Sequence, residues 1–271
     1  MSEAASTLRP VALITGASAG IGVALAHVFA QNGHQVALVA RRKEKLVELA
    51  DSIAATGRAR PLVLPIDLTC DDAVTRITTE LATQGLEPQY VVNNAGFGLL
   101  GEAAKLDRAE QLAMIDLNVR ALADLSLGFV DSLGRQRGGI LNVGSVAGFL
   151  PGPGMAVYYA SKAFVLSFSE ALHQELSGRG IRVTVLCPGP VPTEFQDRAG
   201  IGKIAGSRVL TFTAEQVAVI GYDALMRGRR VVVPGIANKL VTLLPCLLPR
   251  AFFLRAVARS QLSQLRSSKS S

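Results

Sequence analysis

Short apolar segments alternate with longer segments whose apolar positions recur at helical spacing, from residue 11 to about residue 234. The short segments predict buried strands at residues 11–15, 35–40, 62–66, 90–92, 140–143, 183–187 and 230–233. The longer segments predict helices at residues 21–31, 43–55, 71–83, 107–133 (one or two helices), 158–176 and 214–226. Apolar strands that alternate with helices predict an α/β fold, with one doubly wound parallel sheet and helices on both of its faces.

The domain organisation follows from the same alternation. Nearly half of the 271 residues are apolar, which is enough for a substantial core, and no linker rich in Pro, Gly or Ser divides the pattern. We therefore expect one domain over residues 1–236. Residues 237–271 depart from the pattern and form a basic, apolar tail, for which the spacing from Ala251 predicts a helix.

Charge separates this tail from the rest of the chain. The net charge is +7, but no acidic residue follows Asp223, and nine basic residues do. The remaining 19 basic and 21 acidic residues leave the body at −2, which argues against a nucleic-acid-binding surface. A basic amphipathic tail could rest on an anionic membrane, which would suit a lipophilic ketone, or it could cover the cleft or a subunit interface, which we favour.

Cysteine and histidine usage indicates the compartment. Three widely spaced cysteines and three scattered histidines form neither a disulfide framework nor a metal-ligand pattern. The first ten residues contain Glu3 and no apolar run, so we expect no secretory signal. The apolar stretch 240–254 is interrupted by two prolines and an arginine, and is too short to span a membrane. We expect a cytoplasmic protein, with peripheral membrane contact as the alternative.

A glycine-rich turn follows the first predicted strand. Gly16, Gly20 and Gly22 lie between that strand and the first helix. Glycines at such a turn allow the backbone to approach a pyrophosphate at the helix N-terminus, although a purely structural turn would show the same residues.

The end of the second predicted strand indicates which nucleotide binds. NAD sites usually carry Asp or Glu there, which binds the ribose 2′-hydroxyl. This chain has Ala40 followed by Arg41 and Arg42, so no carboxylate would repel a 2′-phosphate, and Arg41 can pair with it. The alternative is that both arginines are solvated, but the pattern favours NADP(H). Asp67 is positioned either to accept from the adenine amine or to cap a helix.

Tyr158 and Lys162 are four residues apart, which places them on one face of a helix. A nearby ammonium favours the phenolate, so we expect Lys162 to lower the pKa of Tyr158 and make it a proton donor and acceptor. Tyr159 lacks this partner, because Ala163 occupies its +4 position.

Together these motifs resemble the short-chain dehydrogenase/reductase family. The resemblance runs from about Pro10 to Pro234 and includes Thr15-Gly-x-x-x-Gly-x-Gly22, Asn93-Asn-Ala-Gly96, Ser145, Tyr158-x-x-x-Lys162 and Pro188-Gly189. Ala40-Arg41-Arg42 and the sequences around Tyr158 and Pro188 are similar to a branch of general NADP-preferring reductases. The family implies a Rossmann fold and interconversion of a ketone or aldehyde with an alcohol by hydride transfer.

The resemblance also implies residue roles. Tyr158 would be the acid/base, Lys162 would tune it and hold the nicotinamide ribose, Ser145 would donate to the carbonyl oxygen, and Asn118, in an interrupted helix, would hold a water molecule. The implied NADP(H)-binding residues are Gly16, Ser18, Gly20, Ile21, Gly22, Arg41, Asp67, Leu68, Asn94, Ala95, Gly96, Tyr158, Lys162, Pro188, Gly189, Val191 and Thr193. Residues 194–212, with three glycines, would form a mobile lid.

Two other functions share parts of this pattern. A nucleotide-binding redox sensor or regulator would not need Ser145, Tyr158 and Lys162, and all three are present. A sugar epimerase of the extended group would need a larger C-terminal domain than 35 residues provide.

Family members usually pair through the helix that carries Tyr158, and its apolar surface predicts a homodimer or homotetramer.

Overall fold

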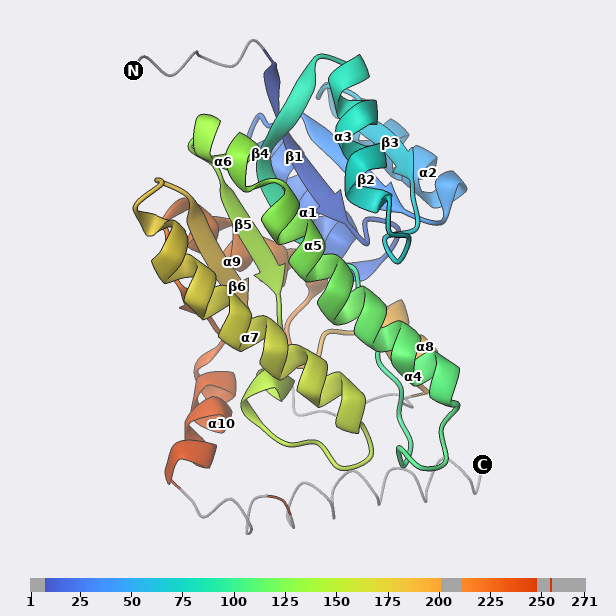
Figure 1. The fold of residues 1–271 in the computed structure, drawn as a ribbon, viewed down its shortest axis with the longest axis vertical. Coiled ribbons are helices and arrows are strands. Elements are labelled where there is room, and N and C mark those ends of the chain that lie inside the picture. The colour runs from blue at the N-terminus through green and yellow to red at the C-terminus, as the bar shows by residue number, and fades with distance from the viewer. Residues whose placement is uncertain (1–7, 201–210, 248–253, 255–271) are drawn as a thin grey trace.

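The computed structural model describes residues 8–200, 211–247 and 254. These residues contain one seven-stranded sheet with the strand order β3-β2-β1-β4-β5-β6-β7, in which every neighbouring pair is parallel. The strands are β1 (Arg9–Thr15), β2 (Val36–Ala40), β3 (Leu62–Pro65), β4 (Leu86–Asn93), β5 (Gly139–Val143), β6 (Arg182–Leu186) and β7 (Val231–Val232). The predicted doubly wound parallel sheet is confirmed (Figure 1).

Helices cover both faces of the sheet. They are α1 (Gly20–Gln31), α2 (Lys43–Ala54), α3 (Ala73–Thr83), α4 (Arg108–Ile115), α5 (Leu122–Gly128), α6 (Val130–Arg135), α7 (Ala156–Ser177), α8 (Glu194–Ala199), α9 (Ala214–Met226) and α10 (Ile236–Leu247). A π-helix, η1 (Asp116–Ala121), joins α4 to α5, and a 3-10 turn, η2 (Val146–Phe149), follows β5. In Figure 1, α5 and α7 cross the front of the sheet, and α1 and α9 lie behind it.

The core has two halves because successive strand residues point to opposite faces. In β1, Ala12 and Ile14 pack with α1, α2 and α9, whereas Val11 and Leu13 pack with α3, α5 and α7. Each fully buried large apolar side chain contributes roughly 1.5–3 kcal/mol to folding. The continuous apolar runs of the strands are thus explained by burial on both faces.

Strand β4 begins earlier than its apolar run predicts. It starts at Leu86 rather than Tyr90, and the next residue, Glu87, is buried. The Glu87 carboxylate accepts hydrogen bonds from Arg135 at 3.0 Å and from Gln136 at 2.7 Å, which compensate for its burial. A strand that contains a charged residue is shorter in the hydrophobic pattern than in the structure, which is why the start of β4 was missed.

The carboxyl ends of the strands position the functional side chains. Because all strands are parallel, the segments that follow them meet at one edge of the sheet. The order of strands reverses between β1 and β4, which leaves a crevice at this edge. Its contributors are the glycine turn after β1, Arg41 after β2, Asn94 after β4, Ser145 after β5 and Pro188 after β6.

The tail, which we expected to be helical, begins with helix α10, ahead of the helical pattern that starts at Ala251. Asn238 of α10 is buried, and a side chain added at Gly189 would meet its amide at 2.6 Å, so the start of the tail packs against the loop after β6. The helix predicted from Ala251 lies outside the described residues except for Leu254, and the division at residue 236 stays a prediction. No helix in the described part of the chain is long and apolar enough to cross a membrane.

Candidate active site

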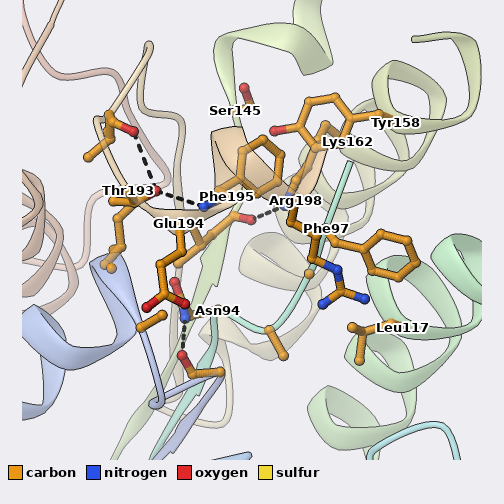
Figure 2. A pocket seen from close by; sticks show the side chains of 18 of the residues that line it. Asn94, Phe97, Leu117, Ser145, Tyr158, Lys162, Thr193, Glu194, Phe195 and Arg198 are labelled. Atoms are coloured by element: carbon orange, nitrogen blue, oxygen red, sulfur yellow. Dashed lines mark hydrogen bonds between the residues drawn. The ribbon is translucent and has the colours of Figure 1, made fainter. Parts of the chain in front are cut away.

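A cleft of about 930 Å³ follows the carboxyl edge of the sheet. It is lined by every predicted site residue except Gly22 and Asn118, which lie beneath its surface. Figure 2 shows its inner end, where Ser145, Tyr158 and Lys162 lie close together, and its side walls from Phe97, Leu117 and the segment Thr193–Arg198.

The glycine turn packs tightly against the segment after β4. The φ angle of Gly16 is 63°, a conformation that favours glycine, and a side chain at Gly22 would meet the Gly16 carbonyl oxygen at 2.2 Å. The Thr15 hydroxyl accepts from the Asn94 amide at 2.9 Å, and the Asn94 side chain donates to the Thr15 carbonyl at 3.0 Å. The two loops therefore form one continuous floor to the cleft.

Two arginines, rather than one, lie at the outer end of the cleft. Arg41 is 3.9 Å from the carboxylate of Asp67. Arg42 donates to the Ser18 carbonyl at 3.0 Å and to Glu194 at 3.0 Å, and it also contacts the Ser18 hydroxyl. From the sequence, only Arg41 was assigned to the site, with solvation as the alternative for both arginines, and the contacts of Arg42 with Ser18 were missed.

Asp67 is held by its own turn. Its Oδ1 accepts from the Thr69 amide at 3.0 Å and from the Thr69 hydroxyl at 2.8 Å. Burial raises the pKa of Asp67, but these hydrogen bonds and Arg41 outweigh that effect and hold the pKa below its ordinary value. Asp67 is therefore a carboxylate fixed at the cleft wall, and its role toward a nucleotide stays a prediction.

Tyr158 and Lys162 project from one face of α7, as their spacing predicts. The Lys162 ammonium lies 5.9 Å from the centroid of the Tyr158 ring, and it donates to the Val143 carbonyl oxygen at 2.8 Å. The Tyr158 hydroxyl lies beside the Ser145 side chain, which follows β5 (Figure 2). Two hydroxyls and a buried ammonium thus converge at the inner end of the cleft.

The expected lowering of the Tyr158 pKa is wrong for this structure. Burial is the largest influence and raises the pKa to about 12, although the hydrogen bond with Ser145 lowers it. Burial also lowers the pKa of Lys162 to about 8. Desolvation dominates because Lys162 is buried and directed toward Val143, and because Tyr158 is half-buried and surrounded by protein at the inner end of the cleft.

Asn118 is buried in the π-helix η1, which corresponds to the interruption expected in the helical segment 107–133. Its side chain donates to the Phe97 carbonyl at 2.9 Å and accepts from the Phe97 amide at 3.0 Å. It also donates to the Ser161 hydroxyl at 3.2 Å. Asn118 therefore fixes the backbone beside the cleft, and the water-holding role stays a prediction.

The predicted lid begins with helix α8, and its residues 201–210 lie outside the described part. The Phe195 ring packs 5.5 Å from the Tyr158 ring, and Arg198 lies 4.2 Å from the centre of the Phe97 ring (Figure 2). These aromatic and cationic walls were missed because no periodicity marks a six-residue helix. Among the described residues, no group of three or more His, Cys, Asp or Glu side chains is positioned to hold a metal ion.

The parallel sheet, the glycine turn and the Ser-Tyr-Lys group define a dinucleotide-binding oxidoreductase. A model of the short chain dehydrogenase family matches residues 10–202, which is more than half of the chain. The protein therefore belongs to the short chain dehydrogenase family, as its motifs predict.

Several known proteins are similar to this chain. Sulfoacetaldehyde reductase 2 of Chromohalobacter salexigens is 40% identical over 191 residues, 69% of this chain and 75% of the relative. The NADP-dependent 3-hydroxy acid dehydrogenase YdfG of Salmonella typhi is 37% identical over 188 residues, 68% of this chain and 74% of the relative. The structure of a short-chain dehydrogenase from Sphingobium yanoikuyae in complex with NADPH has a TM-score of 0.77 and 32% identity, and the match covers 88% and 93% of the two chains.

Proposed function

We propose that this protein is an NADP(H)-dependent oxidoreductase that interconverts a ketone or aldehyde with an alcohol. One observation carries the proposal: the side chains of Ser145 and Tyr158 lie side by side near the buried Lys162, at the inner end of the cleft (Figure 2). When bound, the nicotinamide would supply or accept a hydride at this end.

The cofactor assignment is supported by the outer end of the cleft. The glycine turn lines the cleft at the N-terminus of α1, where a pyrophosphate would bind, and Ala40 offers no carboxylate to repel a 2′-phosphate. Arg41, which is 3.9 Å from Asp67, and Arg42, which contacts Ser18, both line the cleft and can pair with such a phosphate. Two similar proteins are also described with NADP or NADPH.

The catalytic roles follow from charge. Reduction of a carbonyl places negative charge on its oxygen, and the Ser145 and Tyr158 hydroxyls can both donate to that oxygen. Because burial raises the pKa of Tyr158 to about 12, its phenol stays protonated near neutral pH and can act as the proton donor. Lys162 would hold the nicotinamide ribose and stabilise the phenolate that forms, and the backbone near Asn118 would connect this group to water.

A non-catalytic redox sensor remains the alternative. Such a protein would bind the nucleotide without needing the three polar groups at the inner end, and their juxtaposition favours an enzyme. To test this, purified protein would be assayed with NADPH and a panel of ketones and aldehydes, with the loss of NADPH absorbance as the readout. Turnover that disappears in Tyr158→Phe supports the proposal. NADPH binding without turnover of any compound favours the sensor.

The relatives indicate a first set of substrates. Sulfoacetaldehyde and 3-hydroxy acids each carry an acidic group close to the reacting carbon. We propose that short acidic carbonyl compounds be tested before the lipophilic ketones that the basic tail suggested.

We also propose that the protein is a homo-oligomer paired through α7. Phe164 is 38% exposed although its ring stacks on Phe168 at 5.3 Å, and Leu112, Ile115 and Leu127 on neighbouring helices are exposed as well. Light scattering at micromolar concentration should show a dimer or larger assembly that Phe164→Asp weakens. A monomeric wild-type protein would exclude this pairing.

Peripheral membrane contact through the tail is a second proposal. On α10, Ile236, Leu240 and Leu243 are exposed at helical spacing, beside the exposed Lys239, and only basic charges follow. Flotation with anionic vesicles should recover more wild-type protein than a variant with Gln at these three apolar positions. These substitutions are preferable to truncation, because Asn238 packs against Gly189. Equal recovery would leave the tail as a cover or interface.

A further inference from the structure

Arg198 differs from the other cations of the cleft. Among the residues that the structure describes, four cationic side chains line the cleft: Arg41, Arg42, Lys162 and Arg198. The first three have oxygen partners in Asp67, Glu194 and the Val143 carbonyl. Within the described part of the chain, no carboxylate lies within 4.0 Å of the Arg198 guanidinium, and no oxygen accepts a hydrogen bond from it.

Its position is defined by the ring of Phe97. The guanidinium carbon lies 4.2 Å from the ring centre. The Asn118 side chain holds the backbone of Phe97 in place, because it is hydrogen-bonded to both the N–H and the carbonyl oxygen of that residue. Figure 2 shows the guanidinium between Phe97 and Leu117, inside the cleft. Stacking occupies one face of the planar group and leaves its N–H edge free for a bidentate acceptor.

Arg198 is also close to the reaction centre. Phe195, one turn earlier in α8, contacts the Tyr158 ring at 5.5 Å. Gly98, adjacent to Phe97, is so near Tyr158 that an added Cβ would lie 3.2 Å from its ring. The Ala199 carbonyl accepts from the Leu100 amide at 2.9 Å, which ties the end of α8 to the same loop. A small molecule at Tyr158 would therefore reach the guanidinium.

We infer that Arg198 binds an acidic group, a carboxylate or sulfonate, of the carbonyl substrate and so selects acidic over neutral substrates. The inference rests on the proposed reductase function. The Arg198 side chain remains exposed toward the cleft, but partial burial and the positive charge of Arg41 lower its pKa, and Glu110 only partly opposes them. Such a cation gains more from an anionic ligand than a fully solvated arginine would. The same chemistry would suit the diphosphate of the cofactor, so the experiment must separate these two anions.

The test compares matched substrates that differ only in charge: 3-oxobutanoate with 3-oxobutanamide, and 4-oxobutanoate with 4-oxobutanamide. Wild-type enzyme with saturating NADPH should prefer the acid in at least one pair. In Arg198→Met, kcat/KM for that acid should fall by about 10- to 100-fold, mainly through KM, because a charge-assisted hydrogen bond is lost. The amide should change by less than about 3-fold, and Arg198→Lys should retain part of the preference.

The control is Arg227→Met, which removes an exposed arginine outside the cleft and should leave the preference unchanged. An equal fall for acid and amide, or a raised KM for NADPH, would overturn the inference and assign Arg198 to the cofactor or to the packing of α8. Reduction of neither compound would contradict the proposed function for these substrates. Calorimetric binding of the same pairs to enzyme saturated with NADP⁺ then decides the inference: a preference for acid that Arg198→Met removes supports it, and equal binding overturns it.

Discussion

The ammonium of Lys162 donates a hydrogen bond of 2.8 Å to the carbonyl oxygen of Val143, and so joins helix α7 to the end of strand β5. Lys162 is buried, so this contact brings a cationic group into the interior of the protein. Burial lowers its pKa to about 8, below the ordinary value of 10.5. The Lys162 ammonium, which we assign to the active site, therefore also makes the free energy of unfolding depend on pH.

Between pH 8 and pH 10 the unfolded chain binds more protons at Lys162 than the folded protein does. The free energy of unfolding should therefore rise with pH in this window, relative to Lys162→Met, by roughly 2–3 kcal/mol. Above about pH 10 the raised pKa of Tyr158 lowers the free energy of unfolding of each protein, because the folded state then holds the extra proton, and this effect is common to both proteins. Urea unfolding of both proteins at several pH values measures the difference. A difference that is constant from pH 8 to pH 10 would contradict the lowered pKa.

Tyr158→Phe should abolish carbonyl reduction and leave cofactor binding nearly intact. Phenylalanine keeps the ring that packs on Phe195 but removes the proton, so turnover should fall by about 10²- to 10⁴-fold. Fluorescence titration with NADPH provides the binding readout. Tyr159→Phe, one residue further along α7, is the matched control and should keep its turnover. If the Tyr158 variant stays active and the control does not, the acid is Tyr159.

Arg41→Ala and Arg42→Ala should each weaken NADPH binding and leave NADH binding almost unchanged. The first removes the cation beside Asp67 and the second the cation beside Ser18, and loss of one charged hydrogen bond to a phosphate should cost about 10-fold or more in affinity. Arg58→Ala removes an exposed arginine outside the cleft and serves as the control. Titration of both nucleotides into each protein checks this, and equal wild-type affinities for NADPH and NADH would remove the argument from Ala40.

The sequence predicts the features that depend on local spacing along the chain, and it does not predict those that depend on burial or on the path of a loop. Runs such as Val11–Thr15 predict strands because parallel strands are buried on both faces, and Tyr158 and Lys162 share a face because helical spacing dictates it. Spacing does not encode desolvation, so the direction of the Tyr158 pKa shift could not be predicted. Arg198 shows no pattern, since its place over Phe97 depends on how the segment after Thr193 folds back over the cleft.

Gly22→Ala should destabilise the protein and weaken cofactor binding together. A Cβ at this position would lie 2.2 Å from the backbone carbonyl oxygen of Gly16, and 2.6 Å from the side-chain amide nitrogen of Asn94, which is itself hydrogen-bonded to the turn. Backbone atoms cannot yield as a flexible side chain can, so overpacking should cost about 1–3 kcal/mol and displace the turn that would face the pyrophosphate. Gly178→Ala is the matched control. Its added Cβ would meet nothing within 4 Å, and its φ of −65° suits alanine, so stability should be unchanged or higher by up to about 1 kcal/mol. Thermal unfolding and NADPH titration of both variants give the two readouts. Normal NADPH affinity in a folded Gly22→Ala protein would show that the turn tolerates a side chain and does not need this close packing to bind the nucleotide.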